Sequence, residues 1–172
     1  MNALVFGNLL SLINPLLHLV LIVNAFVASS MSAYVKLNGP VIVGLVILYV
    51  QLKLSRFVLG HVVRTWPMTG PLLIRPVSAN NCNIMNSGGK LDNPWIGMPS
   101  GHVMSTAFIL TLYGLMIPRL KNSTYYWLFV VALVMLVSTG RVLKECHTVN
   151  QCIVGCICGI LLAVIVSRNI RM

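Results

Sequence analysis

Between Thr148 and Val166 the chain reads TVNQCIVGCICGILLAVIV, a run of 19 residues without a charged side chain. About 20 apolar residues are enough for a helix to cross the hydrocarbon core of a bilayer. The small residues Gly155, Gly159 and Ala163 recur every four positions, a spacing typical of close packing between membrane helices. This stretch predicts a membrane-spanning helix that packs tightly against a neighbour.

Four other apolar stretches complete the predicted bundle, over residues 3–29, 40–63, 102–118 and 125–140. The first lacks the basic start and the cleavage site of a secretory signal, so we expect it to be retained. Of the 172 residues, 58% are hydrophobic and 8% charged, whereas about a quarter are charged in soluble domains. We therefore predict one integral membrane domain over residues 1–172, an all-α polytopic bundle of about five transmembrane helices.

The charged residues exclude several classes of function. Only Asp92 and Glu145 are acidic, whereas two-carboxylate glycosidases and proteases, two-metal phosphatases and Ca²⁺ sites all need clustered carboxylates. The net charge is +10, but the twelve basic residues are scattered singly between apolar runs and form no stripe or tail. We predict no nucleic-acid partner and assign these charges to helix ends and to an anionic substrate.

Five cysteines are present, four of them between Cys146 and Cys158. They include no CxxC pair or histidine motif with the spacing of a zinc site. We expect these cysteines to be small buried hydrophobic residues and Cys82, in a long polar loop, to be unpaired.

The long polar loop, residues 64–99, is rich in Pro, Gly and Asn. A loop of this length in a compact membrane protein is typical of a functional segment. Polar motifs gather with it on one face of the predicted bundle. These motifs are Arg75-Pro76, then Pro99-Ser100-Gly101-His102, then Arg141 followed by His147 and Gln151. The pattern predicts an active site at one membrane face.

The residue types in these motifs suit a bound phosphate. Ser100 stands where the third predicted helix begins, and the free N–H groups of Gly101 and His102 point out of that helix end toward an anion. Glycine allows the close approach of a ligand to the backbone. Arg75 and Arg141 carry planar donor groups that match phosphate oxygens.

Two histidines in the motifs, His102 and His147, are sufficient for one nucleophile and one proton donor. His147 and Gln151 are four residues apart and share one face of the last helix. The carbonyl oxygen of Gln151 can accept from one ring N–H of His147, which leaves the other ring nitrogen free to attack.

The motifs resemble those of the type 2 phosphatidic acid phosphatase superfamily, which read K-x6-R-P, P-S-G-H and S-R-x5-H-x3-D. The second is complete at residues 99–102. The third matches at Arg141 and His147, with Gly140 and Gln151 in place of Ser and Asp. P-S-G-H followed by R-x5-H at the next helix pair is a specific combination.

The first motif matches only at Arg75-Pro76, because Met68 occupies the position of the Lys. Arg64, at the end of the second predicted helix, is our first candidate for a substitute, since a cation at a helix end can reach the same phosphate. Lys53 and Arg56 are the alternatives, because cations within a membrane helix face an interior or polar cavity.

The resemblance implies a metal-independent and cofactor-independent phosphatase whose partner is a membrane lipid phosphate. His147 would attack phosphorus, His102 would protonate the leaving group, and water would hydrolyse the phosphohistidine. Residues 147–155 resemble the H-T-x-x-Q-V-x-x-G pattern of the dolichyldiphosphatase branch, although that branch reads P-S-S-H where Gly101 stands. A polyprenyl or dolichyl diphosphate is the expected substrate, with phosphatidate or a sphingoid phosphate, or an inactive lipid-phosphate binder, as alternatives. In these roles Gln151 orients His147, and the phosphate is bound by Arg64, Arg75, Ser100, Gly101 and Arg141.

The structural charges predict the orientation in the membrane. Lys36, residues 119–121 and residues 168–171 supply basic residues on the face opposite the motifs. Basic loops favour the cytoplasmic side. We expect the active site to face the lumen, in the endoplasmic reticulum or a related membrane.

Overall fold

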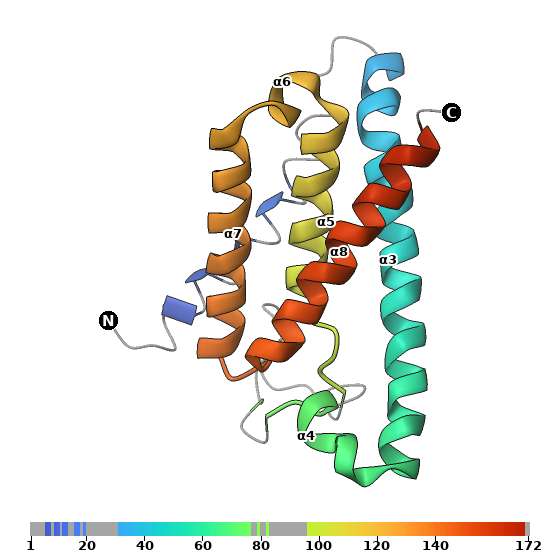
Figure 1. The fold of residues 1–172 in the computed structure, drawn as a ribbon, viewed down its shortest axis with the longest axis vertical. Coiled ribbons are helices and arrows are strands. Elements are labelled where there is room, and N and C mark those ends of the chain that lie inside the picture. The colour runs from blue at the N-terminus through green and yellow to red at the C-terminus, as the bar shows by residue number, and fades with distance from the viewer. Residues whose placement is uncertain are drawn as a thin grey trace.

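The computed structural model describes residues 6–7, 9–10, 12–13, 16–17, 19, 31–76, 79, 82 and 96–170. No β-strand occurs within these ranges, where one isolated antiparallel bridge pairs Ile74 with Ile96. The prediction of an all-α bundle is confirmed (Figure 1). Its described elements are α3 (Met31–Thr65), η1 (Pro67–Thr69), α4 (Gly70–Leu73), α5 (Gly101–Met116), α6 (Pro118–Lys121), α7 (Thr124–Leu143) and α8 (Val149–Ile170).

Three of the described helices are long and apolar enough to cross a membrane: Val35–Thr65 within α3, together with α7 and α8. They indicate a membrane protein. α5 is apolar but has only 16 residues, about 24 Å at 1.5 Å per residue, which is less than the thickness of the hydrocarbon core. The first predicted span, residues 3–29, falls largely outside the described residues.

The second predicted helix begins earlier than expected. α3 starts at Met31 and contains Pro40, so the helix extends beyond both ends of the predicted span over residues 40–63. A proline removes one backbone hydrogen bond, but membrane helices tolerate it where neighbouring groups or a local adjustment satisfy the freed carbonyl. Pro118 behaves as expected, since α5 ends at Met116 just before it.

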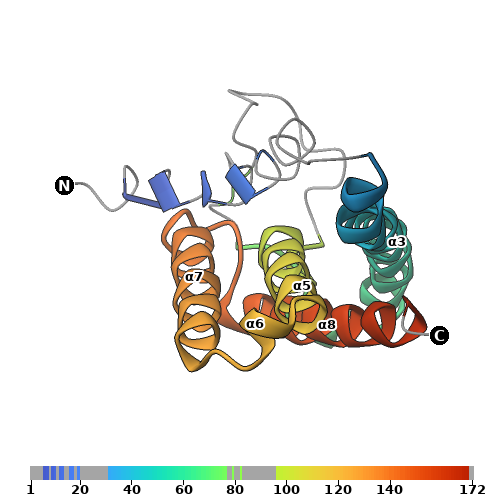
Figure 2. The same cartoon turned by 90° about the horizontal axis from the view of Figure 1, so that it is seen from above.

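α5 is the central helix of the bundle, and 11 of its 16 residues are buried. α8 crosses it and packs most extensively against it (Figures 1 and 2). A Cβ atom on Gly155 would lie 2.7 Å from the Ser100 carbonyl oxygen, and one on Gly159 would collide with the Met104 carbonyl oxygen. The predicted close packing of the small residues is confirmed.

α3 contacts α5 through one close packing contact and one side-chain hydrogen bond. A Cβ atom on Gly44 would overlap the ring of Phe108, so the glycine makes room for that ring. Nearer the start of α3, the Tyr113 hydroxyl donates to Asn38 Oδ1 at 2.6 Å. These contacts set the face of α3 that is turned toward the start of α5.

The chain directions bring four helix ends to one end of the bundle. In Figure 1, α3 and α7 run down the page and α5 and α8 run up it, so α5 and α8 begin where α7 ends and α4 lies. The residues of the three sequence motifs gather at this end.

Candidate active site

The turn between α7 and α8 places His147 beside Arg141. Glu145 takes the left-handed conformation, with φ of 55°. The N–H of Cys146 donates to the Arg141 carbonyl at 3.0 Å, and the N–H of Glu145 donates to the Val142 carbonyl at 2.8 Å. These two bonds form the Schellman motif, which folds the chain back over the last helical turn. The R-x5-H spacing follows from this turn, since the His147 N–H also reaches the Arg141 carbonyl at 3.3 Å.

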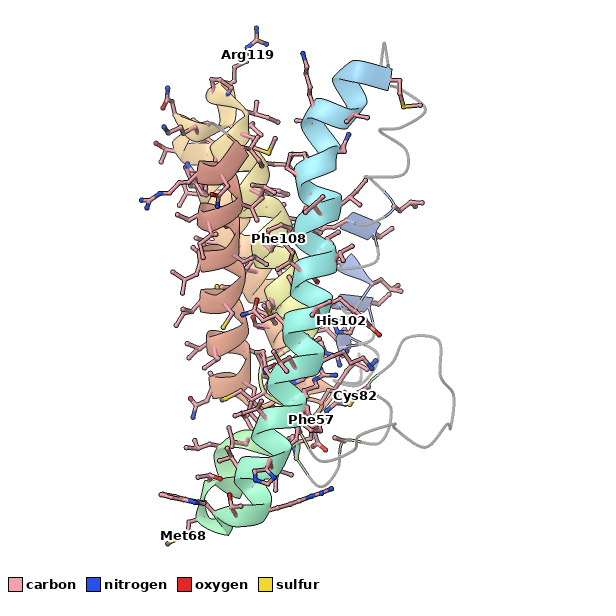
Figure 3. All side chains as sticks on the ribbon, turned by 90° about the vertical axis from the view of Figure 1, so that its right-hand side faces the viewer. Phe57, Met68, Cys82, His102, Phe108 and Arg119 are labelled. Carbon is pink, nitrogen blue, oxygen red and sulfur yellow. A yellow bond between two sulfur atoms is a disulfide. The ribbon has the colours of Figure 1, made fainter. Side chains whose placement is uncertain are left out.

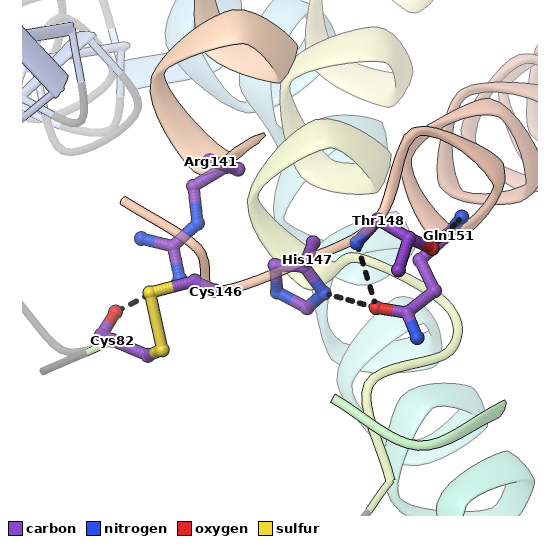
Figure 4. Close-up of a disulfide and its surroundings, with 6 residues drawn as sticks. All are labelled: Cys82, Arg141, Cys146, His147, Thr148 and Gln151. Carbon is purple, nitrogen blue, oxygen red and sulfur yellow. Dashed lines mark hydrogen bonds between the residues drawn. A yellow bond between two sulfur atoms is a disulfide. The ribbon is translucent and has the colours of Figure 1, made fainter. Parts of the chain in front are cut away.

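Gln151 joins His147 to a distant part of the chain. Its Oε1 lies 3.2 Å from His147 Nδ1 and accepts from the Thr148 N–H at 3.3 Å (Figure 4). Because an amide oxygen only accepts, Nδ1 carries the hydrogen and Nε2 keeps its lone pair. Gln151 Nε2 donates to the carbonyls of Leu72 at 3.2 Å and Ile74 at 2.8 Å. The predicted contact between Gln151 and His147 is confirmed, and the amide also holds the α4 segment.

The α4 segment in turn carries Arg75 to the site. Ile74 pairs with Ile96, and the Gly97 N–H donates to the Leu73 carbonyl at 2.8 Å. A Cβ atom on Gly97 would collide with Gln151 Oε1 and lie 2.9 Å from Arg75 Cγ. Only glycine leaves room for the amide and the arginine stem to pack here.

A cavity of about 410 Å³ opens between α3, the start of α5 and the α7–α8 turn. One part of its wall is polar and carries the two histidines of the motifs together with arginine side chains. The other part is apolar and belongs to α3. The polar lining consists of Arg56, Arg75, Gly101, His102, Ser105, Arg141 and His147, and the α3 lining of Leu45, Leu48, Tyr49 and Leu52.

Three arginines converge on this cavity. The buried nitrogens that lack a hydrogen-bond partner include Nε of Arg56, and Nε and Nη1 of both Arg75 and Arg141. Among the described residues the one acidic side chain is Glu145, which is exposed. Burial and the charge of Arg56 lower the pKa of Arg75 to about 10. Buried cations with unsatisfied donors are costly, and an anion bound in the cavity would relieve that cost.

His147 is held in its neutral form. It is 2% exposed. Burial lowers its pKa well below the usual 6.5, and the charges of Arg141 and Arg75 lower it further, while the Gln151 hydrogen bond acts in the opposite direction. At neutral pH the imidazole is therefore unprotonated, and Nε2 has the lone pair that a nucleophile needs.

The family model of the PAP2 superfamily matches residues 16–172. The chain belongs to the PAP2 superfamily. Searches of the curated proteins and of the solved structures gave no match. Members of the PAP2 superfamily are phosphatases, which supports a phosphoric ester hydrolase.

In this PAP2 protein most of the site residues predicted from the motifs lie together, at the cavity or directly beside it. Gln151 lies directly behind His147. Ser100 is the N-cap of α5, but its side chain makes no capping bond, and its buried hydroxyl lies by the Cys152 thiol outside the cavity lining. The predicted residues that line the cavity are Arg75, Gly101, His102, Arg141 and His147.

The structure does not bring Arg64 to the cavity. Arg64 is exposed in the last turn of α3 and is not among the lining residues. Met68, at the Lys position of the first motif, is 96% exposed and lies far from His102 (Figure 3). Lys53 lies over the Tyr49 ring, 5.6 Å from its centre.

Of the three candidate cations, Arg56 is the one that the fold places at the cavity. It lines the cavity, and its Nη2 is 4.0 Å from the position of a Cβ atom on Gly101. The helical spacing of Arg56 from Leu45, Leu48 and Leu52 puts all four on one side of α3. That spacing is the sequence signal that would have ranked Arg56 above Arg64.

The prediction that Cys82 is unpaired was wrong. Cys82 forms a disulfide with Cys146, and its carbonyl oxygen accepts from Arg141 Nη2 at 2.9 Å (Figure 4). The pairing joins residues 64 positions apart, so local sequence gives no sign of it. Cys152, Cys156 and Cys158 remain free.

Proposed function

We propose that this protein hydrolyses a membrane lipid phosphate through a phosphohistidine, with a polyprenyl or dolichyl diphosphate as the preferred substrate. The observation that carries the proposal is the two-sided cavity, in which neutral His147 and three arginines face an apolar wall of α3. A negatively charged head and an apolar tail fit these two walls. Tyr49 in that wall is 59% exposed, so this part of the wall is open and a lipid tail can enter there from the membrane.

His147 is the nucleophile in this mechanism. Its Nε2 attacks phosphorus, a bond from nitrogen to phosphorus forms, and the bond from phosphorus to the leaving oxygen breaks. His102, at the first turn of α5, gives its proton to the leaving oxygen. Water then attacks phosphorus while His102 takes a proton from that water. The bond from phosphorus to His147 Nε2 breaks, its electron pair returns to Nε2, and inorganic phosphate leaves.

The arginines hold the phosphate oxygens during both steps. The three arginines and the N-terminus of α5 at Gly101 line the cavity, and such donors stabilise the charge that develops in the transition state. We assign Arg56 to the role of the missing motif-one Lys. A diphosphate ester carries more negative charge than a monophosphate ester, so three guanidinium groups favour it.

The enzyme is proposed to be metal-independent. Within the described ranges, no three His, Cys, Asp or Glu side chains are grouped closely enough to hold a metal ion. The guanidinium groups and the helix terminus supply the positive charge that a metal would otherwise provide.

The active site is proposed to face the lumen of the endoplasmic reticulum or a related membrane. The basic residues Lys36, Arg119, Lys121 and Arg168 belong to the ends of the helices away from the cavity. A basic face of this kind favours the cytoplasm.

A phosphate-release panel in detergent with EDTA tests the function. It compares a polyprenyl diphosphate, phosphatidate, a sphingoid phosphate and a soluble phosphate ester, using wild type and His147→Ala. We expect the fastest release from the diphosphate and none from the variant. Faster release from phosphatidate or the sphingoid phosphate would show that this lipid, and not the polyprenyl diphosphate, is the preferred substrate.

An inactive binder is the competing function, favoured by Met68, Gly140 and Gln151, which depart from the family motifs. Labelled phosphate on His147 after mixing with substrate identifies an enzyme. Binding of the lipid phosphate without any such label identifies the binder.

A further inference from the structure

A disulfide joins the long loop to the turn that carries the nucleophile. Cys146 directly precedes His147, and its partner Cys82 lies 64 residues earlier in the chain. Both cysteines are buried, with exposures of 0% and 1%. The loop and the α7–α8 turn are therefore linked covalently beside Arg141 and His147 (Figure 4), which line the cavity.

Cys82 also contacts Arg141, one of the three arginines that line the cavity. Its carbonyl oxygen accepts from Arg141 Nη2 at 2.9 Å, whereas Nε and Nη1 of Arg141 have no hydrogen-bond partner. A carboxylate in this place would orient the guanidinium group but would neutralise its charge. A carbonyl oxygen orients the group and leaves its charge for the phosphate.

We propose that the Cys82–Cys146 disulfide positions the catalytic groups, and that full activity requires this bond to be oxidised. The inference rests on the proposed phosphatase function. The bond keeps the Cys82 carbonyl within reach of Arg141, and it ties down the turn in which Glu145 holds a left-handed conformation that is uncommon for residues other than glycine. A misplacement of about 1 Å at a reacting group costs about 100-fold in rate.

The bond also assigns a compartment to the active site. Disulfides persist in the lumen of the endoplasmic reticulum and outside the cell, and are rare in the cytosol. The cavity end of the bundle therefore faces the oxidising side of its membrane. This reason is independent of the distribution of basic residues.

Reduction and reformation of the bond are both ordinary thiol chemistry. A water-soluble phosphine passes two electrons to the disulfide and becomes a phosphine oxide with oxygen from water, leaving two thiols. An oxidised glutathione or a protein disulfide restores the bond by thiol–disulfide exchange and is itself reduced.

The first experiment compares oxidised and reduced protein. Free thiols are blocked, the disulfide is cleaved with the phosphine, and the two new thiols are alkylated and located by mass spectrometry. We expect kcat/KM for the polyprenyl diphosphate to fall by about 10- to 100-fold. Cys82→Ala and Cys146→Ala should match the reduced protein, and Cys158→Ala, a free cysteine away from the cavity, should match wild type.

A pH profile distinguishes positioning from simple stabilisation. The charges that act on His147 are those of Arg141 on α7, Arg75 after α4 and His102 on α5. Arg56 on α3 acts in turn on Arg75. A loosened turn admits water, so the pKa of His147 should rise toward 6.5 and the acid limb of kcat should move to higher pH. A disulfide that only stabilises the fold would lower the amount of active enzyme and leave KM and the profile unchanged, which would overturn the proposal.

Binding of inorganic phosphate separates this proposal from the proposed function. If wild type hydrolyses lipid phosphates and reduction changes neither the kinetics nor phosphate binding, the positioning role of the disulfide is refuted and the phosphatase function stands. If wild type hydrolyses none of them but reduction weakens phosphate binding about 10-fold, the phosphatase function fails and the role of the disulfide at the anion site stands. In sealed vesicles, the membrane-impermeant phosphine should inactivate only those with the lumenal face outward, and inactivation of the opposite orientation would overturn the assigned compartment.

Discussion

Replacement of Gln151 tests the link between the nucleophile and the rest of the site. The side chain is fully buried and makes four hydrogen bonds, two through Oε1 and two through Nε2. Gln151→Ala removes the acceptor that selects the His147 tautomer. One such bond is worth about 1–3 kcal/mol, and about 1.36 kcal/mol is a tenfold change in rate. We therefore expect kcat to fall by about 10- to 100-fold.

The same variant should also be less stable. The carbonyls of Leu72 and Ile74 lose their donor, and each part-buried hydrogen bond that is lost costs about 1 kcal/mol. Kinetics are therefore normalised to the number of active sites, and thermal unfolding is measured separately. Asn150→Ala is the matched control, because Asn150 is an exposed amide on the same helical turn.

Gln151→Glu separates charge from geometry. The carboxylate can still accept from His147, and its charge should raise the pKa of His147 by stabilising the imidazolium. The acid limb of the kcat profile should then move to higher pH, since the nucleophile must be neutral. Because an ionised carboxylate cannot donate to the Leu72 and Ile74 carbonyls, kcat should stay below wild type at high pH as well. Full activity of Gln151→Ala, or an unshifted profile in Gln151→Glu, would refute this account of Gln151.

Three further results are expected. His147→Ala should abolish phosphate release, whereas His102→Ala should keep activity on substrates with good leaving groups, because a proton donor matters most for a basic leaving group; equal partial losses across all substrates would contradict these roles. Arg56→Gln should raise KM or lower kcat by about 10-fold or more, since it removes a buried charged donor. Arg64→Gln, on the same helix but exposed, should leave both constants near wild type. The reverse ranking would assign the role of the missing motif-one Lys to Arg64. Activity should persist in excess chelator and be inhibited by vanadate, which mimics five-coordinate phosphorus, and recovery of chelator-treated enzyme by Mg²⁺ alone would show a metal requirement.

The pKa of His147 also predicts the effect of pH on stability. Its folded-state pKa lies well below the ordinary 6.5, so the unfolded chain binds a proton more readily than the native protein. This contribution to stability is complete above about pH 6.5 and is lost progressively as the pH falls from there through the lower folded-state pKa.

Local sequence was sufficient for those features that depend on neighbouring residues. Apolar runs of span length predicted the helices, because a bilayer requires about 20 such residues. The spacing of His147 and Gln151 predicted their hydrogen bond, since i and i+4 share a helix face. The R-x5-H spacing predicted that Arg141 and His147 lie together, and a single turn of backbone hydrogen bonds accomplishes this.

Only the tertiary structure decided which distant residues complete the site. Arg56 shares one side of α3 with Leu45, Leu48 and Leu52, but only the packing of α3 against the start of α5 shows that this side, and not Arg64, meets the cavity. The Cys82–Cys146 bond spans 64 residues, and Gln151 reaches carbonyls 77 and 79 residues away. Pairings at such separations depend on how the helices pack and where the long loop returns, which no local spacing encodes. The sequence by itself determined the helices and the chemistry of the motifs, and three-dimensional packing determined the third arginine, the disulfide and the second role of the amide.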